Sequence, residues 1–493
     1  MGWSSVCRRE PSIQFSLRHE ICRIGCFFGI GIAICGYGLG AESHQASGVK
    51  IGEVTDTTAI AWIRYTRNSA PNSRGPVFDR DGENDELPAN KIGDPATFKW
   101  AAPGAPGKVH LRYSMKPDVT DAQETAWVEV GERDDFQHQF RLTELTPGSE
   151  YFYASETAPL DGSSVHAPVR GRFQTAPRPD QASPVTFALL NCQMFAHRDH
   201  PNGFNMYSAA LALDPQFVVF TGDNVYYDRD LPFARSPALA RFHWQRMYGL
   251  PRHAELLRSV GSYWMKDDHD TLGDDSWPGK VDRRLTPFTF TEGQRIFREQ
   301  VPMGERTYRT FRWGRDLQIW LIEGRDFRSP NPGPDGPQKS ILGSEQKHWL
   351  RESVAASDAT WRILISPTPW VGPDRGGNKA DNHADPSFHH ESAEMLGWFR
   401  DTLGENFAII CGDRHWQYHS VHPQFGVHEF SIGPCSGAHA QHPLEDPAWH
   451  RFFRDKGGFA SVSVARADAV PRLTIRLHET HGMVVYQWTA EGQ

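Results

Sequence analysis

The sequence is poor in the features that define disulfide-stapled proteins. Four of its seven cysteines lie in the first 40 residues, and only Cys192, Cys411 and Cys435 follow them. Three cysteines cannot staple so long a chain, so at least one of them is a free thiol or a metal ligand. No internal repeat is recognisable, and nothing therefore indicates a repeat architecture.

Long apolar runs are absent after residue 40, and positive charge is in deficit. The 52 Lys and Arg residues face 60 Asp and Glu residues, a formal charge of -8. Phosphate backbones are held by clustered Lys and Arg, so this balance argues against specific nucleic-acid binding. The acidic charge balance fits better a protein whose carboxylates gather around cations. The hydrophobic content of 39% is ordinary for a globular protein, and 493 residues predict two or three domains.

The first 41 residues are predicted to be a signal peptide. Four arginines precede an apolar, glycine-rich run over residues 24–40, which ends in small residues. This pattern predicts cleavage near Gly40 or Ala41 and export to the periplasm or the extracellular space. A retained membrane anchor is the alternative, but the run is shorter than the ~20 residues that cross a bilayer. The Arg8-Arg9 pair leaves the choice between the general and the twin-arginine export routes open.

Residues 42–178 are predicted to form an all-β sandwich of the fibronectin type III or immunoglobulin kind. Alternating apolar and polar residues recur in this part, and residues 137–153 give a strand, a Pro-Gly turn and an aromatic strand. That arrangement is typical of a tyrosine corner. Residues 67–107 are rich in Pro, Gly, Asn and Asp, and we interpret them as a long surface insertion.

Residues 179–493 have the pattern of an α/β domain that follows a proline-rich linker at 176–184. A predicted helix over 204–213 separates apolar strands at 185–190 and 216–220, which gives a strand–helix–strand unit. Later strands are predicted at 262–265, 317–322, 361–365 and 407–410, and helices at 344–355 and 391–403.

Four of the apolar strands run directly into residues that bind metals. These segments are Asn191-Cys192-Gln193, Gly222-Asp223-Asn224-Val225-Tyr226, Asp267-Asp268-His269-Asp270 and Gly412-Asp413-Arg414-His415. In open α/β sheets, ligands bind beyond the carboxyl ends of the strands. We therefore expect the four segments to converge on one site.

The residue types in these segments suit a pair of cations that hydrolyses a phosphate ester. Two cations roughly 3.5–4 Å apart generate hydroxide and stabilise the leaving oxygen. Asp223 is the natural bridging ligand, Tyr226 can reach the same cation as a phenolate, and Cys192 adds a thiolate. The competing interpretations are a turn carboxylate for Asp223 and a small buried hydrophobe for Cys192.

The order of these motifs resembles the calcineurin-like metallophosphoesterases. A cysteine in the first motif, an extra aspartate before the third and a final Gly-Asp-x-His are similar to the alkaline phosphatase D family in particular. Residues 341–350 also look like that family's Leu-Gly-x-x-Gln-x-x-Trp-Leu helix start. The resemblance implies a four-layer α/β/β/α metallophosphoesterase sandwich preceded by the β-sandwich domain.

The resemblance also implies a ligand set and two metals. Cys192, Asp223 and Tyr226 would surround Fe(3+), with Ca(2+) as the second metal. The residues that would complete the site with Asp223 are Asp268, Asp413 and His415.

Three residues are expected to act on the substrate rather than on the metals. His269 would stabilise or protonate the leaving group, and its neighbour Asp270 is a candidate for orienting that imidazole. Arg325 falls where the family has an Asp-x-Arg segment, and its guanidinium suits phosphate. The alternative for Arg325 is an ion pair with Glu323 or Asp326.

Two departures from the family pattern affect the second metal. Where the family often has paired asparagines, this chain has Gly273-Asp274-Asp275, which makes Asp274 a candidate ligand and leaves the identity of that metal open. The histidine of the fourth superfamily motif has no clear counterpart, although His383, His389 and His390 lie in the right interval.

The function expected from the sequence is that of an exported phosphoesterase in which metal-bound hydroxide attacks phosphate esters. The expected partners are small phosphomonoesters or phosphodiesters, or cell-envelope polymers. We expect a monomer that makes no stable membrane insertion after cleavage. The alternatives are a phosphodiesterase or phospholipase-type hydrolase on the same site, and a non-catalytic binding protein that retains the scaffold.

Overall fold

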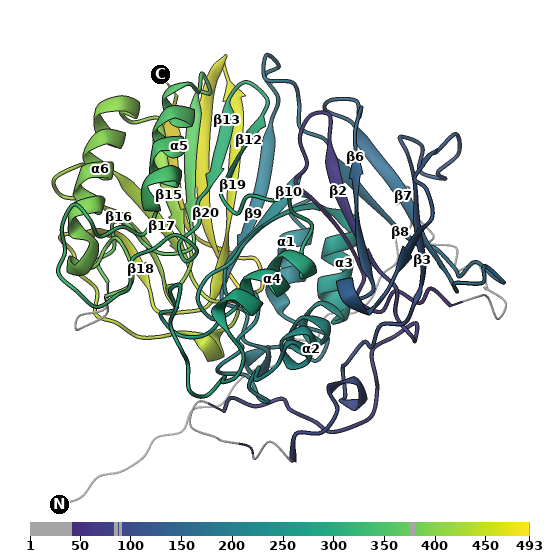
Figure 1. The fold of residues 1–493 in the computed structure, drawn as a ribbon. Coiled ribbons are helices and arrows are strands. Elements are labelled where there is room, and N and C mark those ends of the chain that lie inside the picture. Colours follow the sequence, from purple (N-terminus) through teal and green to yellow (C-terminus); the bar gives the residue numbers. More distant parts are fainter. Residues whose placement is uncertain (1–41, 83–86, 88–90, 375–379, 493) are drawn as a thin grey trace, which may run out of the picture. The chain divides into compact units, whose positions relative to one another are not determined.

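The computed structural model describes residues 42–82, 87, 91–374 and 380–492, so the predicted signal peptide lies outside the described residues. Within these ranges the strands form three sheets of nine, seven and five strands, accompanied by six α-helices (Figure 1). The mixed α/β class expected from the sequence is confirmed. None of the helices in the described part is long and apolar enough to cross a membrane.

The nine-stranded sheet has a parallel centre. Val218 pairs with Ala188 on one side and with Ser262 on the other. The helix Asn205–Leu211 lies between the strands that carry Ala188 and Val218, which gives the predicted strand–helix–strand unit. In spatial order the strands are β21 (Val484–Glu491), β20 (Val470–Glu479), β19 (Gly458–Ala467), β9 (Val185–Leu190), β10 (Phe217–Thr221), β11 (Gly261–Met265), β1 (Val49–Gly52), β2 (Ala59–Arg64) and β6 (Gln137–Leu142).

The seven-stranded sheet also has a parallel centre, made by four of its strands. Its spatial order is β12 (Arg309–Trp313), β13 (Leu317–Leu321), β14 (Trp361–Ser366), β15 (Phe407–Cys411), β17 (His428–Ile432), β16 (Gln417–Val421) and β18 (His450–Arg454). The predicted strands at 317–322, 361–365 and 407–410 thus all lie in this sheet.

Separate apolar cores cover the two faces of each sheet. In β9, Phe187 and Leu189 pack into the core between the sheets, whereas Ala188 and Leu190 pack into the core beneath the helices. Because neighbouring residues of a strand face opposite sides, burial on both faces requires an unbroken apolar run. This explains why the central strands show no alternation in the sequence.

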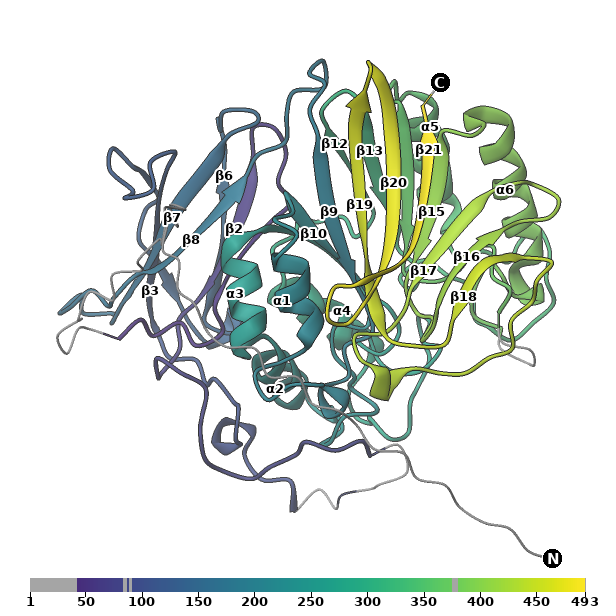
Figure 2. The same cartoon turned by 180° about the vertical axis from the view of Figure 1, so that it is seen from behind.

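The helices lie on the outer faces of the two sheets in both views (Figures 1 and 2). Four of them share a core with the nine-stranded sheet, and two share a core with the seven-stranded sheet. The first four are α1 (Asn205–Leu211), α2 (Pro237–Tyr248), α3 (Pro251–Ser259) and α4 (Phe290–Gln300), and the other two are α5 (Gly343–Ala355) and α6 (His389–Leu403).

The N-terminal β-rich segment packs as two sheets around its own core. β1, β2 and β6 face the five-stranded sheet, which contains β4 (Gln123–Glu124), β3 (Gly107–Ser114), β7 (Glu150–Ala158), β8 (Val169–Gln174) and β5 (Val128–Val130). The hydroxyl of Tyr151 accepts a hydrogen bond from the amide of Thr146 at 2.9 Å, as a tyrosine corner requires.

The predicted domains at 42–178 and 179–493 share the nine-stranded sheet. β1 pairs in parallel with β11, where Gly52 lies opposite Ser262. Residues Ala41–Gln493 group into one compact unit. The boundary at residue 178 stays a prediction about the chain, and the hydrogen-bonded sheet runs across it.

Candidate metal centre

A cavity of about 350 Å³ lies where the strand-end segments meet, and we call it the metal cavity. Tyr226, His269, Asp274, Asp413 and His415, all predicted from the sequence, line it. The other lining residues are Asp81, Met194, His197, Arg229, Ala438, His439, Ala440 and Gln441. β9, β10 and β11 of one sheet and β15 of the other therefore direct their carboxyl ends to one place, as expected.

Cys192, Asp223 and His415 offer donor atoms that lie within 4.8 Å of one another. The Cys192 thiol donates to Asp223 Oδ2 at 3.3 Å, and the Tyr226 hydroxyl donates to the same oxygen at 2.9 Å. Tyr226 Oη also lies 3.4 Å from His415 Nε2. These residues are far apart in the chain, and the fold assembles them into one donor set.

Close approach of the strand ends explains the Gly-Asp pairs. A Cβ on Gly222 would lie 2.8 Å from the Cβ of Asp267, and one on Gly412 would lie 2.7 Å from Asn191 Oδ1. Such contacts leave no room for a side chain, so only glycine fits before either aspartate.

Three of the expected ligands also carry unusual backbone angles. Cys192, Asp223 and Asp413 have φ values of 49°, 52° and 61°. Non-glycine residues in this left-handed region cost about 1–3 kcal/mol each, and such residues concentrate at functional sites. The turn after each strand thus aims a side chain into the site at the expense of stability.

The donor set is buried, and its acidic groups outnumber the nearby positive charge of His269. Burial, aided by the nearby carboxylates, raises the pKa of Asp223 well above its usual value, despite the opposing effect of His269. Burial first, and then Asp223, raise the pKa values of Cys192 and Tyr226 as well. Asp223 Oδ1 and both polar side-chain atoms of Asn191 are buried without a hydrogen-bond partner. A cation would neutralise this group, so the residues present fit a metal site.

A second set of carboxylates adjoins the first. Asp223, Asp268 and His269 form one group of donors within 4.8 Å, and Asp268, Asp275 and Asp381 form another. The amide of Asp275 donates to Asp268 Oδ2 at 2.6 Å. Asp223 and Asp268 each belong to two of the groups, which connects the donor sets.

Asp274, predicted as a metal ligand, is not in these donor groups. Its neighbour Asp275 takes that place, while the Asp274 side chain is 40% exposed and lies at the cavity with Oδ1 3.8 Å from His269 Nε2. Sequence alone gives no means of choosing between two adjacent aspartates in a loop. Asp381 was missed because no strand or glycine precedes it.

His269 is oriented by Asp228 and not by Asp270. Its Nδ1 lies 2.6 Å from Asp228 Oδ1, and Arg284 donates to the other oxygen of Asp228 at 3.1 Å. Asp270 instead accepts backbone amides, including that of Asp267 at 2.6 Å, so its expected role is wrong. His269 and Asp270 lie in a turn beyond the end of β11 (Gly261–Met265), where the sequence does not report which way each side chain points.

The charges of the His269 and Asp228 pair reinforce each other. Burial lowers the pKa of His269, but Asp228, Asp268 and Asp223 outweigh it and raise that pKa well above its usual value. Burial alone would raise the pKa of Asp228, yet His269 and Arg284 lower it to about 2. Both shifts favour the imidazolium form of His269 and the carboxylate form of Asp228.

Arg325 does not line the cavity, contrary to its expected role as a phosphate ligand. It is fully buried, with Nε 2.5 Å from Asp267 Oδ1 and Nη2 3.4 Å from Asp381 Oδ2. It therefore holds the second carboxylate set together. Arg229 is the guanidinium that lines the cavity, and it follows Asp228 directly in the chain.

Histidines outside the predicted motifs contribute to the wall of the cavity. His439 Nε2 lies 2.9 Å from Tyr226 Oη, and the rings of His439 and His415 have centroids 4.0 Å apart. No strand end signals His439 in the sequence, since it closes the short 3-10 turn Gly437–His439. Of the histidines considered for the fourth motif, His383 stacks on Trp370 and bonds Glu391 away from the cavity.

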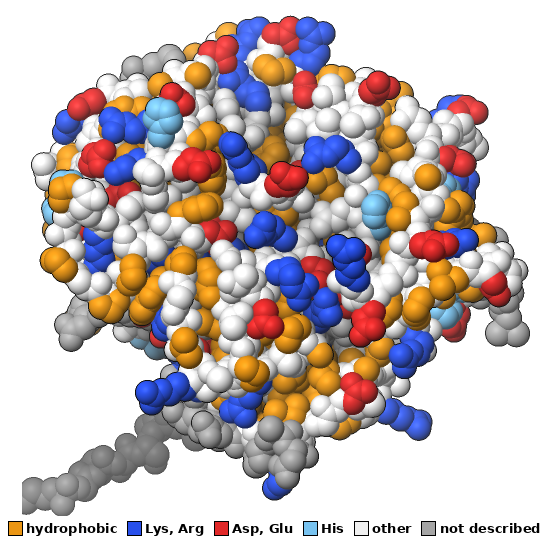
Figure 3. All heavy atoms as spheres, viewed as in Figure 1, with side chains coloured by type: hydrophobic (Ala, Val, Ile, Leu, Met, Phe, Trp, Pro, Cys, Tyr) orange, Lys and Arg blue, Asp and Glu red, His pale blue; other side chains and the backbone are white. Residues whose placement is uncertain are grey.

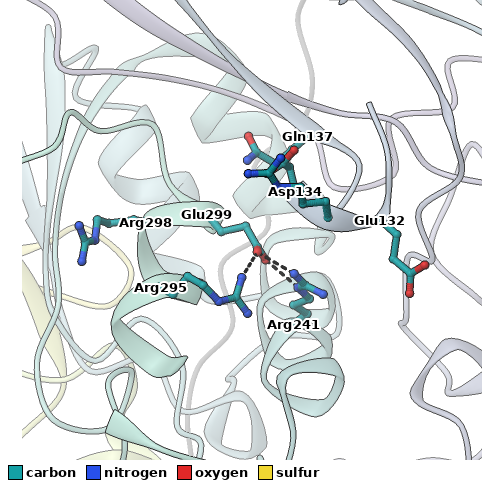
Figure 4. A pocket seen from close by; sticks show the side chains of 8 residues that line it. Glu132, Asp134, Gln137, Arg241, Arg295, Arg298 and Glu299 are labelled. Carbon is teal, nitrogen blue, oxygen red and sulfur yellow. Dashed lines mark hydrogen bonds and ion pairs between the residues drawn. The ribbon is translucent and has the colours of Figure 1, made fainter. Parts of the chain in front are cut away.

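A larger hollow of about 870 Å³ lies elsewhere, between the turn Glu132–Asp134 and helices α2 and α4. We call it the arginine hollow. Figure 4 shows the carboxylate of Glu299 between Arg241 and Arg295, which donate to it at 2.7 Å. None of the predicted metal ligands lines this hollow, so size alone does not identify the functional site.

Comparison with known proteins agrees with the motifs. The family model described as PhoD-like phosphatase matches residues 187–490. Alkaline phosphatase D of Bacillus subtilis (strain 168) is 21% identical over 324 residues, which cover 57% of this chain and 54% of that protein. The chain thus aligns with about half the length of this curated relative.

Two solved structures share the fold. One described as the structure of PhoD has a TM-score of 0.70 and 14% identity, covering 92% of this chain and 91% of that one. A purple acid phosphatase from yellow lupin seeds has a TM-score of 0.60 and 12% identity, covering 90% and 74%. Together with a family model that spans more than half of the residues, these findings show that the chain belongs to the PhoD-like phosphatase family.

Proposed function

We propose that this chain is a metal-dependent phosphoesterase that hydrolyses phosphate esters in the metal cavity. The observation that carries the proposal is the buried set of Cys192, Asp223 and Tyr226, in which one carboxylate oxygen has no partner. Membership of the PhoD-like phosphatase family supports the same reaction class. The donor set is of the kind that binds cations in hydrolases.

The residues present suit two different ions. Cys192, Tyr226 and His415 would hold Fe(3+) together with Asp223, because thiolate and phenolate donors favour iron. The oxygen donors of the second set suit Ca(2+). When bound, such ions neutralise the phosphoryl oxygens and activate water for attack on phosphorus. The residues of the second set are Asp268, Asp275 and Asp381, joined to the first by Asp223.

The chain's own residues bind the substrate and move a proton. Arg229 lines the cavity and would hold phosphate oxygens through its planar fork of donors. His269 would donate a proton from Nε2 to the leaving oxygen as the phosphorus–oxygen ester bond breaks. Asp228 holds the other nitrogen of that ring and keeps the imidazolium charged. Arg229 would thus bind the phosphate, His269 would donate the proton and Asp228 would position the ring of His269.

Fold and export remain proposals in their finer detail. A four-layer α/β/β/α sandwich is supported by the three apolar cores that alternate with the two sheets. Export through a signal peptide over residues 1–41 rests on the sequence pattern alone.

Metal analysis of the purified protein, combined with its visible absorption spectrum, tests the proposal. We expect iron, a visible charge-transfer band and hydrolysis of an aryl phosphate. A colourless protein that stays inactive after iron and calcium are added would support the non-catalytic alternative. That alternative predicts lost ligands, yet Asp223, Asp268, His269, Asp413 and His415 are all present. Rates on aryl monoesters and aryl diesters, compared side by side, separate a phosphatase from a phosphodiesterase.

A further inference from the structure

The segment that carries His439 is fixed against two of the metal-binding motifs. The amide of Gln441 donates to the carbonyl of His415 at 2.9 Å. The thiol of Cys435 donates to the carbonyl of Asn191 at 2.7 Å. The segment is therefore tied to the last motif at one end and to the first motif at the other, and His439 lies between these two contacts.

The turn that carries His197 is held by a buried carboxylate. Asp230 accepts two backbone amides of this turn, from Phe195 at 2.8 Å and from Ala196 at 2.9 Å. The amide of Asp230 donates in turn to the carbonyl of Tyr226 at 3.2 Å. One aspartate therefore connects the backbone beside His197 to the backbone of Tyr226.

These two segments bring three side chains into one line of contacts at the wall of the metal cavity. His197 Nδ1 lies 3.0 Å from His439 Nδ1, and His439 Nε2 lies 2.9 Å from the hydroxyl oxygen of Tyr226. All three residues line the cavity, and His439 is buried. Both ring nitrogens of His439 therefore have a partner.

The chemistry of the three groups decides where their protons lie. Tyr226 would bind a cation as a phenolate, which has no proton and can only accept a hydrogen bond. The contact at 2.9 Å then requires the proton of His439 on Nε2. With Nδ1 of His439 left as an acceptor, the contact at 3.0 Å requires the proton of His197 on Nδ1. Each group in the line thus sets the tautomer of the next.

We propose that His439 is a positioning residue that donates a hydrogen bond from Nε2 to the phenolate oxygen of Tyr226, and that His197 fixes the tautomer in which His439 does so. The inference rests on the proposed metal-dependent function and adds a partner for one of its ligands. Among the described residues His439 belongs to none of the metal-donor groups, which favours a hydrogen bond over direct ligation. A hydrogen bond to a ligating oxygen orients that ligand and reduces the electron density that it gives to the metal.

The experiment compares the visible absorption spectra of the iron-loaded parent protein, His439→Leu and His439→Gln. Without the donor, the phenolate gives up an electron more easily, so the charge-transfer band of His439→Leu should move to longer wavelength. Its iron content should equal that of the parent protein. The side-chain amide of glutamine donates where Nε2 of histidine does, so His439→Gln should keep the band near its original position.

His197→Leu tests the second contact. Without a donor facing its Nδ1, His439 can also hold its proton there, so the band should move in the same direction by a smaller amount. His442→Leu is the matched control, because His442 lies on the same segment, is exposed and contacts Asp455 rather than the cavity. Its spectrum should match that of the parent protein.

The possible failures have different meanings. An unshifted band in His439→Leu with iron still bound would overturn the role of His439. Loss of iron from both His439 variants, with His442→Leu loaded normally, would make His439 a ligand and would also overturn it. Circular dichroism checks folding, and if His439→Leu does not fold, the band of His197→Leu decides. A parent protein without iron, or without the band, contradicts the proposed function itself, and this inference fails with it.

Discussion

The metal cavity and the arginine hollow differ in how their charges are balanced. In the arginine hollow, Glu299 is bound by Arg241 and Arg295, and basic and acidic side chains mingle on the face drawn in Figure 3, over α4 and α2. Beneath the metal cavity, where Tyr226 of its wall contacts Asp223, that carboxylate keeps an oxygen without a partner and has a raised pKa. The smaller hollow is therefore the one that requires a ligand, and volume is a poor guide to function.

The two hollows also differ in the elements that build them. Loops after strands of both sheets supply the metal cavity, and three of the expected metal ligands have strained backbones. Two helices supply the core of the arginine hollow, where regular backbone presents the side chains. We therefore expect mutations at the metal cavity to lower activity rather than stability. Mutations at the arginine hollow should lower stability rather than activity.

Asp223→Asn should have the largest effect of all. Loss of the carboxylate that connects both donor groups should lower kcat by at least about a thousandfold and remove bound metal. Activity and elemental analysis measure both. When metal is removed from both proteins, the variant should not unfold more easily than the parent, because it relieves the burial of an acidic group. Retained metal with full activity would remove Asp223 from the site.

His269→Asn should act on chemistry and leave the metals bound. Removal of the proton donor should lower kcat by about 10²–10⁴-fold for esters of poorly acidic alcohols. Esters of strongly acidic phenols, whose leaving oxygen needs no proton, should lose much less. A uniform loss across both substrates, or a loss of metal, would contradict the assigned role.

Asp228→Asn should have a smaller effect in the same direction. It leaves the ring of His269 in place but removes the carboxylate 2.6 Å from Nδ1, so kcat should fall by about 10–100-fold. The loss should again be greatest for esters of poorly acidic alcohols. Asp270→Asn, whose side chain accepts backbone amides, is the comparison that separates positioning of the ring from folding of the loop.

Glu299→Gln should leave catalysis unchanged and weaken folding. Two arginines lose their shared carboxylate, so the free energy of unfolding should fall by about 1–3 kcal/mol. Chemical denaturation measures the loss, and kcat with bound metal should match the parent protein. Arg298→Gln, a change in the same hollow, should alter neither quantity. A fall in kcat in either variant would contradict the contrast drawn between the hollows.

Several errors in reading the site from the sequence arise because tertiary contacts decide which side chains reach it. The sequence placed Asp270 in the site as the neighbour of His269, and the family resemblance placed Asp274 and Arg325 there. In the structure Asp228 contacts His269, Asp275 belongs to a donor group and Arg229 lines the cavity. Only for Asp274 and Asp275 does a turn choose between neighbours, because Asp228 and Arg229 lie far from Asp270 and Arg325 in the chain and are brought to the site by tertiary contacts. Backbone dihedral angles in such turns depend on tertiary contacts, and no periodicity in the sequence reports them.

The sequence by itself determined the α/β class and the central strands, and it predicted that the polar residues at the strand ends lie together. Unbroken apolar runs require burial on both faces of the sheet. A polar residue that follows such a run therefore lies at the edge of the sheet, where ligands bind. Only the tertiary structure decided that β1, β2 and β6 extend the nine-stranded sheet, that His439 joins Tyr226 and that Asp81 reaches the cavity. These contacts join residues far apart in the chain, and local sequence carries no record of such distant partners.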